Sequence, residues 1–95
     1  MSEHRSKLKI YRDLLAAVES DHVPTWIMYK SRLSWKNMMK HLEELMRRGL
    51  VEEIQIKTET RRKPRRGYAL TPKGKKLLAS LNDVLKLLGE DEVIR

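Results

Sequence analysis

The sequence predicts a small, mainly α-helical domain with one β-hairpin. Long segments near the start, middle and end of the chain carry apolar residues at helical spacing, and in residues 34–48 all apolar side chains fall within an arc of roughly 120°. Residues 50–57 and 68–70 instead favour strands, and a basic segment separates them. With 95 residues, the chain has room for one domain with a modest core.

The first helix is expected over residues 7–20, because Ser6 is a suitable N-cap and apolar residues cover nearly half of the circumference. The following sequence DHVPT interrupts this helix with Pro24, and Thr25 is a potential N-cap for the next one. Residues 26–33 then suit a helix of about two turns at most.

The third helix has clear boundary signals. Ser34 is a good N-cap, Leu33 can pack as a staple on Met38, and Gly49 follows the helix where a left-handed C-cap is favoured. All charged and amide residues of this segment lie outside its apolar arc. Trp35 lies inside the arc, so we expect it in the core, with a base or sugar contact as the alternative.

The hairpin and the last helix follow directly. Ile54 and Ile56 alternate in the first strand, the sequence YAL begins the second strand at residue 68, and residues 58–67 form the connecting loop. Thr71 is the expected N-cap of the last helix, and Pro72 occupies its first turn, where the missing N–H is tolerated.

A short helix, a tight turn and a longer amphipathic helix form a helix-turn-helix arrangement, and a hairpin directly after it is a wing. We therefore expect a winged helix-turn-helix with the order α-α-α-β-wing-β-α and a long C-terminal dimerisation helix. The expected divisions are a flexible N-terminus (1–5), the winged helix-turn-helix domain (6–71), the dimerisation helix (72–89) and an acidic tail (90–95).

The composition excludes several classes of protein. The chain has no cysteine, which excludes disulfides and the usual zinc ribbons, and its three histidines show no ligand spacing, so we expect no metal or cofactor. The sequence contains no carboxylate pair, nucleophile–base set or phosphate-binding glycine loop, so we do not expect an enzyme. Without an apolar run of membrane-spanning length or a signal peptide, we expect a cytoplasmic, nucleoid-associated protein.

Positive charge is concentrated in one part of the chain. The formal net charge is +8, and residues 57–76 hold nine Lys or Arg against one Glu. Such a block attracts polyanions, although a solvated charge run that aids solubility is the alternative.

Several motifs resemble a known family. Leu33-Ser34, Met38, His41-Leu42, Leu45 and Gly49-Leu50-Val51 match the pattern of winged-helix transcription regulators of the arsenic-sensor and multiple-antibiotic-resistance type. The sequence LTPKGKKLL, residues 70–78, is similar to the strand-to-helix junction of archaeal winged-helix proteins that dimerise through a C-terminal helix. The resemblance covers roughly Ser6 to Leu88. The chain departs from the pattern at Ser31 and Arg32, which predicts a looser turn between the second and third helices.

The expected function is binding of double-stranded DNA, with the third helix in the major groove. Lys36, Asn37 and Lys40 are suited to base edges, and Glu44 is expected to hold Lys40 in place. The full set expected on the recognition helix is Ser34, Lys36, Asn37, Lys40 and His41. Phosphate or minor-groove contacts are expected from the wing residues Arg61, Arg62, Lys63, Arg65 and Arg66. Phosphate contacts are expected from Lys73, Lys75 and Lys76 at the start of the last helix.

The last helix also predicts a homodimer. Leucines spaced 3-4-3 resemble a short coiled-coil seam, and this expected dimer interface is Leu78, Leu81, Leu85 and Leu88. Burial of both apolar faces within the monomer is the alternative.

A dimeric, sequence-preferring transcriptional regulator is therefore the leading hypothesis. An architectural, chromatin-like DNA-binding protein of the same fold is the nearest alternative. A winged-helix protein-interaction module, docking its basic loop on an acidic partner, is the third.

Overall fold

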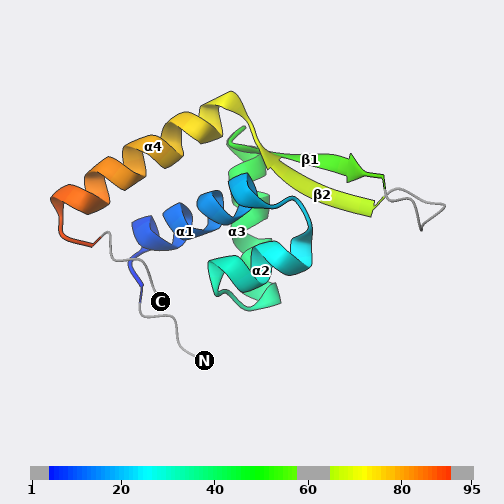
Figure 1. Cartoon of the computed structure of the whole chain (residues 1–95), viewed down its shortest axis with the longest axis horizontal. Coiled ribbons are helices and arrows are strands. Elements are labelled where there is room, and N and C mark those ends of the chain that lie inside the picture. The colour runs from blue at the N-terminus through cyan, green and yellow to red at the C-terminus, as the bar shows by residue number, and fades with distance from the viewer. Residues whose placement is uncertain (1–4, 58–64, 91–95) are drawn as a thin grey trace.

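The computed structural model describes residues 5–57 and 65–90 and has the predicted order of elements (Figure 1). In chain order these are α1 (Lys7–Ser20), α2 (Pro24–Ser31), α3 (Trp35–Arg47), β1 (Val51–Ile56), β2 (Arg65–Leu70) and α4 (Pro72–Leu87). The predicted fold class, mainly α-helical with one small hairpin, is confirmed. None of the described helices has the length and apolar character needed to cross a membrane.

Three of the helices begin at the predicted side-chain caps. The hydroxyl oxygens of Ser6, Ser34 and Thr71 accept hydrogen bonds from the backbone N–H three residues further on, at 3.2, 3.2 and 3.0 Å. After α3, Gly49 adopts a φ of +73°, which is the left-handed conformation that glycine permits at the end of a helix.

The start of α2 differs from the prediction. This helix begins at Pro24 with Val23 as its N-cap, whereas the sequence predicts the N-cap at Thr25. Proline has no N–H to satisfy and its φ suits the first helical position, so the helix can begin before Thr25. The carboxylate of Asp21 accepts a hydrogen bond from Val23 N at 3.1 Å and fixes this entry.

The core is built around α1, which packs against α2, α4 and β2. In Figure 1, α1 lies between α4 on one side and α2 on the other. The apolar face of α3 enters the same core, as its periodicity predicts. The fully buried apolar side chains include Leu14, Leu15, Val18, Ile27, Met38, Leu42 and Leu45.

The hairpin is longer than predicted. β1 and β2 pair antiparallel from Val51↔Leu70 to Ile56↔Arg65, so β2 begins three residues before the expected start at residue 68. Gly67 makes this possible, because a Cβ there would overlap the Ile56 side chain and lie 2.7 Å from the His22 carbonyl oxygen. His22 O also accepts a hydrogen bond from Tyr68 N at 3.0 Å, so the α1–α2 connection borders β2.

The predicted leucine seam of α4 lies mostly inside the monomer. Leu78, Leu81 and Leu85 have exposed fractions of 5%, 5% and 0%, because this face of α4 packs on α1. Only Leu88 of the predicted set is exposed. Three of the four expected interface residues are therefore core residues.

The start of α4 is locked to the α3–β1 connection. Thr71 Oγ1 donates to the Gly49 carbonyl oxygen at 2.7 Å, and Thr71 N donates to the Leu50 carbonyl oxygen at 3.2 Å. Gly74 lies directly over Leu50, where a Cβ would overlap the carbonyl oxygen. A glycine at this position lets the backbone of α4 approach the backbone that follows α3.

We predict that Gly74→Ala destabilises the fold, although alanine is the better helix former. The added methyl group meets backbone rather than a flexible side chain, so the free energy of unfolding should fall by about 1–3 kcal/mol or more in urea denaturation. Ser80→Ala, at an exposed position of the same helix, is the control and should change it by less than about 0.5 kcal/mol. An unchanged unfolding midpoint for Gly74→Ala would contradict the close approach.

Candidate nucleic-acid interface

The exposed face at the N-terminal end of α3 carries the predicted polar residues. Lys36 and Lys40 are exposed and Asn37 is half-buried. Within residues 5–57 and 65–90, neither lysine lies within ion-pair distance of a carboxylate. Ser34 is also exposed, but its hydroxyl oxygen caps the helix. This end of α3 therefore presents two cations and one amide to solvent.

Glu44 does not hold Lys40 as the sequence predicts. Its carboxylate accepts a hydrogen bond from the Tyr11 hydroxyl at 2.7 Å and one from Arg48 at 3.4 Å. Burial, together with the Glu44 carboxylate, raises the pKa of Tyr11 to about 12. The Tyr11 hydrogen bond in turn lowers the pKa of Glu44. The favoured pair is thus a neutral phenol and a charged carboxylate, and it ties α3 to α1.

His41 lies toward α1. Its ring meets that of Tyr11 edge-on, with the ring centroids 5.5 Å apart, and the residue is half-buried. The predicted recognition set is therefore not uniform: Lys36 and Lys40 face solvent, whereas His41 contacts the first helix.

Trp35 is half exposed rather than buried, so the expectation of a core position is wrong. Its exposed fraction is 50%, and Ser34 and Lys36 on either side are also exposed. Periodicity predicts the side of a helix on which a residue lies, but not whether the core extends as far as the helix end. The apolar face of α3 thus continues onto a tip that the core does not cover.

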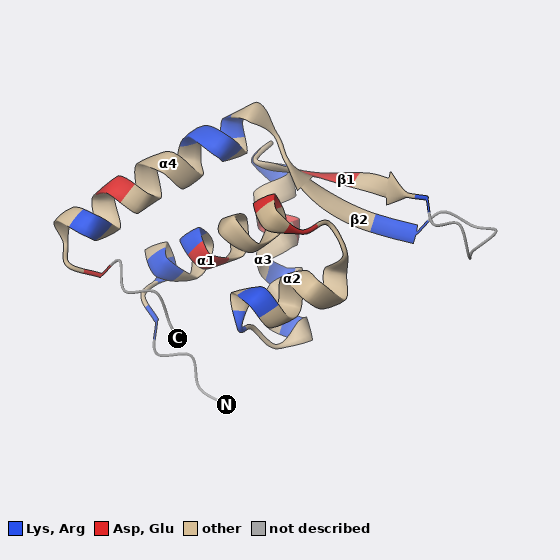
Figure 2. Cartoon of the chain, viewed as in Figure 1, with Lys and Arg blue, Asp and Glu red and all other residues tan. Residues whose placement is uncertain are grey.

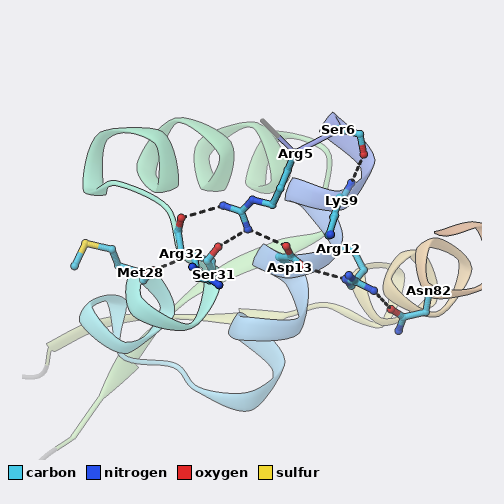
Figure 3. A network of polar contacts seen from close by, with 9 residues as sticks. All are labelled: Arg5, Ser6, Lys9, Arg12, Asp13, Met28, Ser31, Arg32 and Asn82. Atoms are coloured by element: carbon cyan, nitrogen blue, oxygen red, sulfur yellow. Dashed lines mark hydrogen bonds and ion pairs between the residues drawn. The ribbon is translucent and has the colours of Figure 1, made fainter. Parts of the chain in front are cut away.

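The side chain of Arg5, near the N-terminus, holds the turn before α3 (Figure 3). Arg5 donates to the carbonyl oxygens of Ser31 at 2.7 Å and Arg32 at 2.9 Å, and to Asp13 at 2.8 Å. Arg32 itself adopts a left-handed φ of 60°. Ser31 is fully buried, and its hydroxyl donates to the Met28 carbonyl oxygen at 3.1 Å.

These contacts correct two expectations. The sequence predicts Arg5 in a flexible terminus, yet its guanidinium satisfies carbonyl groups at the end of α2. The departure at Ser31 and Arg32 predicts a looser turn, but Arg32 N donates to the Met28 carbonyl oxygen at 3.0 Å and closes it. Arg5 thereby ties α1 to the turn that positions α3.

Acidic and basic residues occupy different parts of the hairpin (Figure 2). Glu52 and Glu53 lie on β1, while Arg65 and Arg66 lie at the outer end of β2. Arg66 forms an ion pair with Glu53 at 3.2 Å, which partly neutralises it, and Arg65 is half-buried. The other predicted wing residues, Arg61, Arg62 and Lys63, lie outside the described residues.

The three lysines at the start of α4 have different environments. Lys73 Nζ donates to the Arg48 carbonyl oxygen at 3.1 Å, so it has a role within the fold at the end of α3. Lys75 and Lys76 are exposed, with no ion pair among the described residues.

Sequence reasoning missed the side chains that hold α3 in place. Tyr11 and Glu44 are 33 residues apart, and Arg5 meets Ser31 across 26 residues. No local pattern signals such pairs. The exposed Trp26 and Tyr29 of α2 were also missed; their ring centroids are 6.1 Å apart.

Comparison with known proteins gives a consistent result. The sequence profile described as winged helix-turn-helix matches residues 4–89. The uncharacterized protein MJ0287 of Methanocaldococcus jannaschii is 28% identical over 85 residues, which cover 88% of this chain and 77% of that protein.

Solved structures share the fold at low sequence identity. Sso10a-2, a DNA-binding protein from Sulfolobus solfataricus, superposes with a TM-score of 0.72 at 24% identity, over 90% of this chain and 83% of its own. The MarR family transcriptional regulator SPO1453 from Silicibacter pomeroyi DSS-3 gives a TM-score of 0.60 at 22% identity, over 85% of this chain and 55% of its own.

The Tyr11–Glu44 contact generates a pH prediction. The pKa of Tyr11 is raised on folding, so its contribution to stability is present below pH 10 and is lost as the pH rises towards 12. Tyr11→Phe should unfold at lower urea concentration than the wild type at pH 8, and the difference should shrink by pH 11.5. A difference that stays constant across this range would show that the hydroxyl does not titrate as described.

Proposed function

The chain belongs to the winged helix-turn-helix family, and from that premise we propose that it binds double-stranded DNA as a homodimeric, sequence-preferring transcriptional regulator. The observation that best supports this function is the exposed N-terminal end of α3, where Lys36 and Lys40 have no acidic partner among the described residues. Proteins of known structure with this fold include a DNA-binding protein and a transcriptional regulator.

In the proposed complex, the N-terminal half of α3 enters the major groove. The N-terminal residues of a recognition helix reach base edges first. Lysine can donate to guanine O6 and N7, and asparagine can bond bidentately to adenine. Lys36, Asn37 and Lys40 are therefore the proposed reading residues. The acidic Glu43 and Glu44 lie towards the other end of α3, away from the proposed base contacts.

The hairpin and the start of α4 supply sequence-independent contacts in this proposal. Arg65 and Arg66, together with Arg61, Arg62 and Lys63, would contact phosphates or a narrow minor groove. Lys75 and Lys76 would extend the phosphate-binding surface. We assign Lys73 a smaller share of the phosphate contacts, because its ammonium group already donates a hydrogen bond to the Arg48 carbonyl oxygen.

The proposed dimer uses a face of α4 next to the one predicted from the sequence. Val84 and Leu87 on this helix and Leu88 at its C-cap are exposed, with Leu87 exposed by 87%. The half-buried Leu77 and the exposed Val84 and Leu88 recur at spacings of seven and four, as along one side of a helix pair. Exposed apolar side chains gathered in this way favour association. A two-fold dimer would present two α3 helices to half-sites about one DNA turn apart.

An architectural role is the second candidate function. More basic side chains lie on the hairpin and α4 than at the N-terminal end of α3. This favours an architectural role, because the expected contacts of these side chains are with phosphates, which carry no sequence information. A competition assay separates the two roles. A regulator should prefer its sites over bulk DNA by about 10³ or more at physiological salt, whereas an architectural protein should show little preference.

The wing and α3 should respond differently to substitution. Replacing Arg61, Arg62, Arg65 and Arg66 by Ala should weaken binding on all duplexes alike. It should also flatten the slope of log K against log salt by up to about 3–4 per subunit, at roughly 0.9 per lost phosphate contact.

Asn37→Ala should instead change which sequence is preferred, at a cost of about 1–3 kcal/mol on the best site selected from a random pool. Both effects can be measured by fluorescence anisotropy titrations across a salt series. If the arginine and asparagine variants behave identically, the proposed division between phosphate and base contacts is wrong.

The dimer generates a separate prediction. Val84→Glu should convert the dimer into a monomer in sedimentation equilibrium, because it places a charge within the proposed apolar contact. Ala79→Glu adds the same charge at an exposed position elsewhere on α4 and should leave the dimer intact. A monomeric wild-type protein at micromolar concentration would refute the dimer outright.

A further inference from the structure

The reading end of α3 carries one large apolar side chain that the proposed polar contacts do not use. Trp35 is the first residue of α3, and half of its surface is exposed. It directly precedes the exposed Lys36 and the half-buried Asn37. An indole left open to solvent at this position places apolar surface beside two hydrogen-bonding groups.

The backbone beneath Trp35 is held firmly. Ser34 caps the helix through Asn37 N, and Met38, one turn further along, is fully buried. Arg5 secures the preceding turn through the carbonyl oxygens of Ser31 and Arg32. The indole is therefore presented from a fixed helix end, so less conformational freedom is lost when it contacts a partner.

The major groove offers one apolar group to such a side chain. Each base presents hydrogen-bond donors, acceptors or both there, and only thymine adds a methyl group, at C5. Lys36 and Asn37 can read hydrogen-bonding groups but cannot recognise a methyl group. An apolar surface next to them would add selection for thymine at a neighbouring base pair.

We infer that Trp35 is a specificity-determining residue that contacts the C5-methyl group of a thymine beside the bases read by Lys36 and Asn37. The inference rests on the proposed function, because it requires α3 to lie in the major groove. It assigns the exposed indole to base readout rather than to the core or to the sugar–phosphate backbone.

The test uses the full chain and its best duplex from in vitro selection. Each thymine is replaced in turn by deoxyuridine, which removes the methyl group and keeps the hydrogen-bonding pattern. At one thymine position per half-site, this replacement should lower the affinity of the wild-type protein for the duplex about fourfold, as expected for burial of one methyl group.

Trp35→Ala should bind the thymine duplex more weakly and should no longer distinguish it from the deoxyuridine duplex at that position. Trp35→Phe keeps an aromatic face and should restore part of the discrimination. Trp26→Ala is the matched control, because Trp26 is exposed by 54% but lies on α2; it should keep the wild-type sensitivity. Circular dichroism verifies that each variant is folded.

Three outcomes would overturn the inference. Wild-type binding that is insensitive to deoxyuridine at every position excludes a methyl contact. Equal sensitivity in the wild type and Trp35→Ala assigns the methyl contact to another residue. Equal weakening of Trp35→Ala on all duplexes assigns the indole to the backbone. In these cases the proposed function stands, whereas absence of duplex binding by the wild type would refute both.

Discussion

Burial of one face of α3 is the constraint on which the described site depends. Met38, Leu42 and Leu45 are almost completely withdrawn from solvent, so the helix cannot rotate about its axis without exposing them. The orientation of its outer face follows from this packing. Lys36 and Lys40 are held outward because the methionine and leucines are held inward.

Polar contacts with α1, with Arg5 and with the start of α4 then fix the position of α3 relative to the rest of the domain. The Tyr11 hydroxyl bonds Glu44, and Arg5 bonds carbonyl groups of the turn that precedes the helix. At the other end, Thr71 bonds the Gly49 carbonyl oxygen and Gly74 allows α4 to lie against Leu50. The helix, the start of the hairpin and the start of α4 are thus joined through short contacts, so Lys36 and Lys40 on α3 share one core with Lys75 and Lys76 on α4.

Much of this arrangement could be predicted from local sequence. The periodicity of residues 34–48 predicted α3 and its buried face, and the caps Ser6, Ser34 and Thr71 predicted three helix starts. The family resemblance, drawn from packing positions such as Leu42 and Leu45, is confirmed. Exposure of Lys36 and Lys40 also followed from the helical pattern, because charged side chains outside an apolar arc remain in solvent.

The remaining features depend on contacts between distant residues. Periodicity showed that α4 has a broad apolar surface, but α1 covers Leu78, Leu81 and Leu85, and no local pattern specifies which side a neighbouring helix covers. The i,i+4 spacing of Lys40 and Glu44 predicted an ion pair, yet the hydroxyl of Tyr11 on another helix bonds that carboxylate. The helical pattern predicts the side of α3 on which Trp35 lies, but the exposure of its indole depends on where the core ends.

The central claim is that the polar end of α3 and the basic hairpin contact the same duplex. Titration of the isotopically labelled protein with a selected duplex, followed by amide NMR spectra, tests it most directly. We predict that the amide signals of residues 34–40 and of Arg65 and Arg66 shift together and saturate at the same DNA concentration. Shifts confined to the hairpin, with the amides of α3 unchanged, would contradict it.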